Sequence, residues 1–130
     1  MSNRVVHFEI PCDNPEKTMD FFREAFGWRF EQFGHEEYWS AYTGDESLPG
    51  INGGLMKRKH PNQPVANSIE VVDIEKAMKD VGNAGGTVVV PKMGIPSVGW
   101  LAYFKDPDGN IHGLFQDDPK AVYTPGEPIV

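Results

Sequence analysis

The sequence predicts an α+β fold in which two tandem βαβββ modules form a curved mixed sheet around a central trough. The main observation is an internal repeat at an offset of 59 residues, which aligns Ile10 with Ile69 and Asn14 with Asp73. Each copy reads as a strand, a capped helix and then three strand-like stretches. Two such copies would leave their concave faces to enclose a ligand-sized space.

Length and composition describe one globular domain. The chain has 130 residues, of which 39% are hydrophobic and 24% charged. We expect a first module at about 4–60, a second at about 65–117 and a C-terminal tail at 118–130.

The first module begins with a strand from Val5 to Ile10 that alternates between two faces. Asn14 then caps a helix with Pro15 at its first position, and Gly27 ends that helix. The apolar stripe of the helix consists of Met19, Phe22 and Phe26. The three strands that follow are expected at Trp28 to Phe33, Glu37 to Thr43 and Ile51 to Lys57.

The second module repeats this order. Its helix is expected from about Ile74 to Asn83, ended by Gly85 and Gly86. Asp106 to Gly109 predicts a tight turn, because Pro107 presets one dihedral angle and Gly109 accepts a positive φ. The three strands are expected at Thr87 to Val90, Val98 to Lys105 and Asn110 to Gln116.

These motifs resemble the vicinal oxygen chelate superfamily, which includes glyoxalase I, the bleomycin resistance proteins and the extradiol dioxygenases. The resemblance extends from Val5 to about Gln116 and is strongest to the poorly characterised glyoxalase-like members. The segments that carry it are the strand with His7, the helix with Phe21-Phe22 and Gly27, Asp106-Pro107-Asp108-Gly109-Asn110 and Gly113-Leu114-Phe115-Gln116.

The resemblance also implies where a metal ion would bind. Metal-dependent members hold a divalent ion with ligands from the first and last strands of each module. His7 is the one ligand-type residue retained here, since its repeat partner is Ala66, or Asn67 if the register slips by one. The last-strand positions are Gly54 and Gly113, which have no side chain to offer. The prediction is therefore no metal site and no cofactor, with a divalent ion held by His7 and Glu9 as the alternative.

A pocket is expected on the helix-free faces of the strands. The two glycines leave room for a ligand to approach the backbone. The predicted pocket residues are His7, Glu9, Gly54, Ser68, Glu70, Trp100 and Gly113. Further candidates for stacking on a ligand, with the strand face of each left open, are Trp39, Tyr42 and Tyr103.

Three functions are compatible with this pattern. The first is a metal-independent protein of the bleomycin-resistance kind that binds a small aromatic or cationic molecule through Glu9, Glu70 and aromatic rings. The second is an enzyme, either a lyase or isomerase or a dioxygenase-like protein. Its candidate catalytic residues are His7 and Glu9, with or without a divalent metal. The third is a regulatory module that acts as a dimer.

Net charge and cysteine content indicate which kinds of binding partner and which cellular compartment to expect. The net charge of −7 argues against binding nucleic acid or an anionic membrane, because both need a positive surface. Cys12 is the only cysteine, and the first residues lack the apolar run of a signal peptide, so we expect a cytoplasmic protein. The resemblance adds the expectation of a homodimer around a small-molecule ligand.

Overall fold

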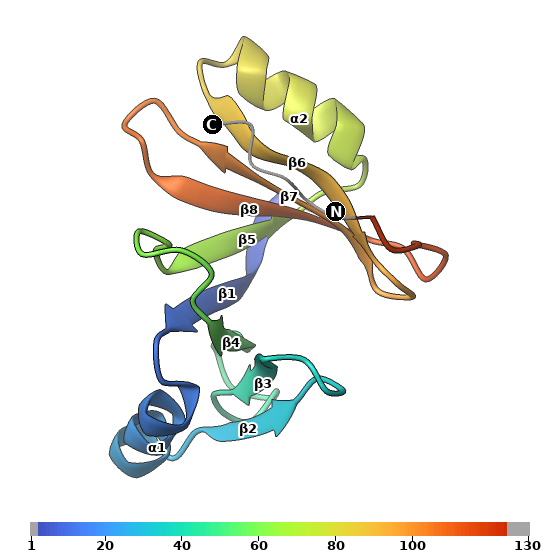
Figure 1. Cartoon of the computed structure of the whole chain (residues 1–130). Coiled ribbons are helices and arrows are strands. Elements are labelled where there is room, and N and C mark those ends of the chain that lie inside the picture. Colours follow the sequence, from blue (N-terminus) through green and yellow to red (C-terminus); the bar gives the residue numbers. More distant parts are fainter. Residues whose placement is uncertain (1–2, 125–130) are drawn as a thin grey trace. The chain divides into compact units, whose positions relative to one another are not determined.

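The computed structural model describes residues 3–124, which form two compact units (Figure 1). Residues 6–66 form the first module, and residues 67–124 together with 3–5 form the second. Each module contains one helix and a mixed sheet, so the α+β class and the tandem βαβββ order are confirmed. The trough between the modules stays a prediction. The predicted tail is described as far as Thr124, and its residues 125–130 lie outside the described part.

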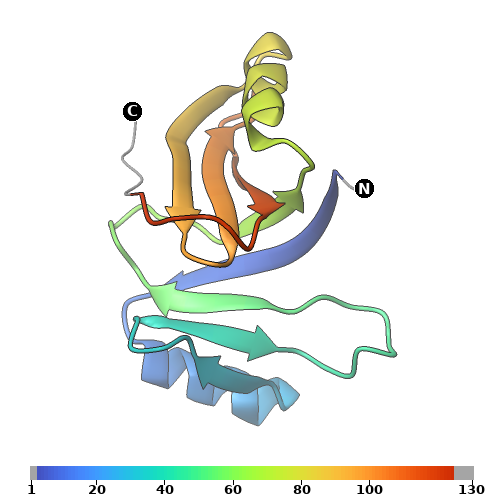
Figure 2. The ribbon, with the colours of Figure 1, turned by 90° about the vertical axis from the view of Figure 1, so that its right-hand side faces the viewer.

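The first module has four strands in the order β2-β3-β4-β1. Strands β1 and β4 run parallel, whereas the pairs β2–β3 and β3–β4 are antiparallel. Figure 2 shows the helix lying against one face of these strands, which leaves the other face without a helix. The elements are β1 (Arg4–Cys12), α1 (Pro15–Phe26), β2 (Arg29–Gln32), β3 (Tyr38–Tyr42) and β4 (Gly53–Lys57).

Both ends of α1 are fixed by the residues that predicted them. The Asn14 side chain accepts a hydrogen bond from the backbone N–H of Lys17 at 3.2 Å, which satisfies one of the free donors of the first turn. At the other end Gly27 adopts a left-handed φ of 74°, and its N–H donates to the carbonyl of Arg23. The predicted helix is confirmed.

The core of the first module lies between α1 and its sheet. Met19 of α1 and Leu55 of β4 are both fully buried, and Cys12 of β1 packs beside them. The partly buried side chains that complete this cluster are Ile10, Phe30 and Trp39. Because side chains alternate along a strand, the residues next to these in sequence point to the opposite, helix-free face.

The second module has the strand order β5-β8-β7-β6, with β5 and β8 parallel. Helix α2 has the bounds that the sequence predicts. Strand β6 runs well beyond the predicted end at Val90, because irregularities on either side of that residue keep the strand paired with β7. Pro91 is tolerated there because β6 is an edge strand. The elements are β5 (Ala66–Glu70), α2 (Ile74–Asn83), β6 (Thr87–Ile95), β7 (Gly99–Lys105) and β8 (Ile111–Asp117).

The core of the second module follows the same plan. Ile74 of α2 packs on Ala102 and Leu114 of the sheet, all three with at most 3% of their surface exposed. Between β7 and β8, the N–H of Gly109 donates to the carbonyl of Asp106 at 2.9 Å, and Gly109 has a φ of 88°. The predicted tight turn is confirmed.

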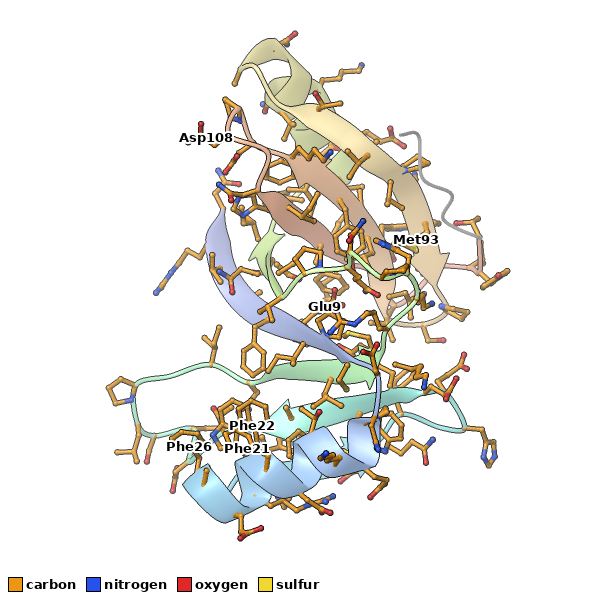
Figure 3. The ribbon with its side chains drawn as sticks, turned by 60° about the vertical axis from the view of Figure 1, so that its left-hand side comes forward. Glu9, Phe21, Phe22, Phe26, Met93 and Asp108 are labelled. Atoms are coloured by element: carbon orange, nitrogen blue, oxygen red, sulfur yellow. The ribbon has the colours of Figure 1, made fainter. Side chains whose placement is uncertain are left out.

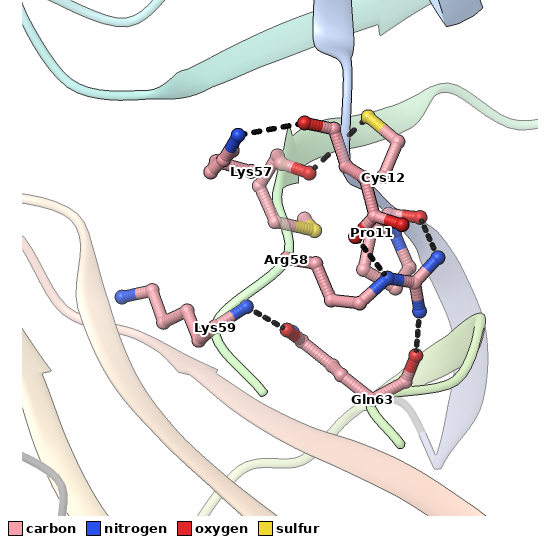
Figure 4. Close-up of polar contacts among 8 residues, drawn as sticks. Pro11, Cys12, Lys57, Arg58, Lys59 and Gln63 are labelled. Carbon is pink, nitrogen blue, oxygen red and sulfur yellow. Dashed lines mark hydrogen bonds and ion pairs between the residues drawn. The ribbon is translucent and has the colours of Figure 1, made fainter. Parts of the chain in front are cut away.

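Arg58 fastens the segment that follows β4 to the end of β1 (Figure 4). Its guanidinium donates to the Asp13 carboxylate at 3.0 Å, to the carbonyl of Pro11 at 3.2 Å and to the carbonyl of Gln63. The Gln63 side chain in turn accepts from the N–H of Lys59. One side chain thus ties three stretches of the first module together.

Candidate functional site

His7 and Tyr38 meet on the helix-free face of the first module. His7 precedes Phe8, whose ring contacts Trp28, and Tyr38 precedes Trp39, which packs in the α1 core. Alternation therefore turns His7 and Tyr38 away from α1. The His7 Nε2 atom and the Tyr38 hydroxyl oxygen lie 2.8 Å apart, which is a hydrogen bond.

Both groups of this pair are held neutral by their surroundings. Burial lowers the pKa of His7, so its imidazole is uncharged near neutral pH. Burial and, secondarily, the negative charge of Glu9 raise the pKa of Tyr38 far above its ordinary value. A neutral imidazole and a neutral phenol hold two protons. One forms the hydrogen bond between the rings, and the other belongs to a second N–H or O–H donor of the pair.

Gly54 makes this contact possible. Strand β4 lies between β3 and β1, so the Tyr38 side chain must cross β4 to reach His7. It crosses over Gly54, where a Cβ atom would overlap the Tyr38 hydroxyl and ring. Gly54 is also paired directly with Glu9 of β1, which places the Glu9 side chain on the same face.

The residues of the first module do not fit the metal site that the resemblance implies. Gly54 stands at the position of the expected carboxylate ligand, and the Tyr38 hydroxyl fills the space above it. The Nε2 atom of His7 is already engaged by that hydroxyl. Among residues 3–124, no three or more His, Cys, Asp or Glu side chains gather in a way that could hold an ion.

In the second module, Ser68 and Gly113 lie together on the helix-free face. They are paired across β5 and β8, and Ser68 is only 3% exposed. A Cβ on Gly113 would lie 3.0 Å from Ser68 Oγ and 3.4 Å from the ring of Tyr103. Glu70, two residues after Ser68, is on the same face by alternation. Three of the predicted pocket residues thus share one face of this module.

Trp100, which the sequence places among the pocket residues, lies instead on the α2 side of its sheet. It packs against the core cluster of Ile74, and its indole N–H donates to the Asp118 carboxylate at 2.9 Å. The Lys92 ammonium lies 4.5 Å from its ring centre. Trp100 therefore stabilises the second module from the face opposite Gly113.

The other aromatic candidates divide between the two faces. Trp39 belongs to the α1 core. Tyr42 and Tyr103 lie on the helix-free faces of their modules, and the Arg29 guanidinium stacks 4.1 Å above the ring of Tyr42. The sequence reading missed Tyr38. Tyr38 shares the face of Gly54 because Ser40, two residues later, pairs with Gly54, and no local sequence pattern indicates that register.

Comparison with known proteins gives a family and a set of similar folds. The model of the Glyoxalase/Bleomycin resistance protein/Dioxygenase superfamily matches residues 4–112. No protein of curated function matches in a sequence comparison.

Solved structures show the same fold. A glyoxalase/bleomycin resistance protein/dioxygenase superfamily member from Vibrio splendidus 12B01 is 21% identical, with a TM-score of 0.62 over 90% of this chain and 100% of that one. A methylmalonyl-CoA epimerase variant from Streptomyces coelicolor, in complex with 2-nitronate-propionyl-CoA, is 15% identical, with a TM-score of 0.62 over 96% and 100%. An NAD-dependent benzaldehyde dehydrogenase from Legionella pneumophila is 13% identical, with a TM-score of 0.63 over 85% and 97%. At these identities the likeness shows the fold alone.

Proposed function

Because the chain belongs to the Glyoxalase/Bleomycin resistance protein/Dioxygenase superfamily, we propose that it binds a small organic molecule without a metal ion, on the helix-free face of its first module. One observation carries this proposal. The Tyr38 hydroxyl lies over Gly54 and bonds His7 Nε2, in the space where a metal ligand would be expected. An organic ligand can use this polar pair directly.

The chemistry of this face favours a ligand with a protonated amine beside a hydrogen-bonding group. The His7–Tyr38 pair offers one donor and one acceptor, whichever ring donates to the other. The carboxylate of Glu9 is close enough for its charge to raise the pKa of Tyr38. The Glu9 carboxylate would attract a cation bound near it in a partly buried site.

A thermal-shift screen tests this proposal. The probes are small aromatic amines and their neutral analogues, measured with and without EDTA. We expect at least one amine to raise the melting temperature equally in both conditions, since binding stabilises the folded state. The Glu9→Gln and Tyr38→Phe variants should lose most of that rise, whereas Glu46→Gln, on an exposed loop, should keep it. A screen in which no amine raises the melting temperature, or in which EDTA abolishes every rise, would refute the proposal.

A second candidate is a proton-transfer enzyme, which the neutral state of His7 near the charge of Glu9 favours. A neutral imidazole or a carboxylate can take a proton from a carbon next to a carbonyl group and return it. One protein of similar fold is a methylmalonyl-CoA epimerase, so methylmalonyl-CoA is a suitable probe. This candidate requires deuterium incorporation at the acidic carbon that both Glu9→Gln and His7→Gln abolish while the fold is intact. Unchanged substrate with the native protein would exclude epimerase activity.

A further inference from the structure

The C-terminal half of α1 carries two exposed phenylalanines. Phe21 is 57% exposed and Phe26 is 65% exposed, although both rings contact each other and Phe22. Figure 3 shows the three labelled side chains gathered on one end of this helix. Burying a phenylalanine side chain is worth about 1.5–3 kcal/mol, so a surface that leaves one this exposed favours contact with a partner.

The residues around Phe21 form a regular stripe. Lys17, Phe21, Glu24 and Ala25 stand at i, i+4, i+7 and i+8 of α1, which places them along one side of the helix. All four are exposed, and Met19 on the other side of the helix is in the core. The stripe therefore has a positive charge at one end, an aromatic ring in the middle and a negative charge at the other end.

We propose that this stripe is a self-association surface and that its occupant is α1 of a second copy of the chain. In an antiparallel pair of helices related by a twofold axis near Phe21, Lys17 of each copy lies opposite Glu24 of the other. The stripe is thus complementary to itself, as a twofold interface requires. The two Phe21 rings pack at the centre against Ala25, and the antiparallel helix dipoles also attract.

The expected dimer is weak. A helix of 12 residues is about 18 Å long, so one of its sides buries less than the roughly 800 Å² per partner of standard interfaces. The net charge of −7 on each chain also opposes association. A concentration-dependent equilibrium between monomer and dimer follows. Charge-swap variants are a sharper test than added salt, which would screen both the repulsion and the two ion pairs.

The experiment is sedimentation velocity from about 10 µM to about 1 mM protein. We expect a dimer that Phe21→Ser abolishes. Lys17→Glu or Glu24→Lys alone should weaken it about tenfold, because each change sets like charges opposite one another twice in the twofold pair. The double variant Lys17→Glu/Glu24→Lys inverts both pairs and should restore association to within about threefold of the native chain.

Two controls separate loss of the interface from misfolding of the variants and from the change in net charge. A glutamate near the start of α1 and a lysine near its end are both favoured by the helix dipole, so circular dichroism should show these variants folded. Lys79→Glu makes the same charge change on the exposed side of α2 and should leave the dimer unchanged. A monomer at every concentration would overturn the proposal. So would a dimer that ignores Phe21→Ser, or a double variant as weak as the single ones. Binding of a strictly monomeric chain to lipid vesicles through Phe21 would assign the stripe to a membrane instead.

Discussion

The Tyr38 hydroxyl lies 2.8 Å from the Nε2 atom of His7, although β4 separates the strands that carry the two residues. The contact passes over Gly54, where there is no side chain to block it. It holds the imidazole in a fixed orientation on the helix-free face. The proposed ligand binding and the proposed proton transfer at this face both depend on that orientation.

Gly54→Ala should destabilise the protein by about 1–3 kcal/mol, because the added methyl group overlaps the Tyr38 side chain. Urea unfolding measures the change. In a Tyr38→Ala background the same substitution should cost much less, since the overlapping ring is gone. Gly44→Ala is the matched control, as its Cβ would meet open space. Equal costs for Gly54→Ala in both backgrounds would contradict the packing of Tyr38 over Gly54.

Stability should fall as the pH drops below about 6.5, the ordinary pKa of histidine, because burial lowers the pKa of His7 in the folded chain. The unfolded chain then binds a proton that the folded chain resists, so the free energy of unfolding decreases with acidification. Unfolding in urea at several pH values should show a smaller decrease in His7→Gln. The exposed His35 is the control, and His35→Gln should keep the native pH dependence. Identical slopes in all three proteins would show that His7 titrates normally.

A second pH effect is expected from the turn between β7 and β8. The carboxylate of Asp106 accepts hydrogen bonds from His112, from the Asn110 backbone and side chain and from the Asp108 N–H, which hold its pKa well below the usual range. Its contribution to stability is present above pH of about 4 and is lost as the pH falls further.

Asp106→Ala should therefore lower the melting temperature at neutral pH and flatten its decline below pH of about 4. Differential scanning calorimetry across this range measures both effects. Asp108→Ala removes an exposed neighbouring carboxylate but keeps the backbone N–H that donates to Asp106, so it should change neither. A melting curve of Asp106→Ala that declines as steeply as the native one would assign the acid sensitivity to other groups.

Arg58→Ala should loosen the segment at 59–63 without unfolding the first module. Its guanidinium makes three hydrogen bonds, and bonds from charged groups contribute about 1.5–3 kcal/mol each. We expect amide hydrogen exchange in this segment to become more than tenfold faster, as measured by mass spectrometry. Lys59→Ala should leave the rate unchanged, because Lys59 contacts Gln63 through its backbone N–H. Unchanged exchange in Arg58→Ala would mean that other contacts hold the segment.

The helices and the repeat could be predicted from sequence because their signals are local. Asn14 and Gly27 have strong preferences for the first and last positions of a helix, and both occupy them. The turn at Asp106 to Gly109 was predicted correctly for the same reason. The offset of 59 residues then identified Gly54 and Gly113 as equivalent positions, each of which lies beneath a tyrosine ring.

The side-chain contacts of the candidate site could not be predicted because they depend on pairing between distant strands. Tyr38 reaches His7 only if β3 pairs with β4 in the observed register and β4 pairs with β1 in parallel. The face occupied by Trp100 depends on the pairing of β7 with β8, and the length of β6 on irregularities that no local pattern reveals. Alternation shows that neighbouring residues differ in face, but pairing decides which face is which.

The most direct test is the metal content of the tag-free protein and of its His7→Ala variant, measured by elemental mass spectrometry. We predict no stoichiometric divalent metal in either protein, because the Tyr38 hydroxyl is the partner of His7 Nε2. A stoichiometric ion in the native protein that His7→Ala removes would contradict this. It would mean that His7 leaves Tyr38 to bind a metal and that the helix-free face is a metal centre.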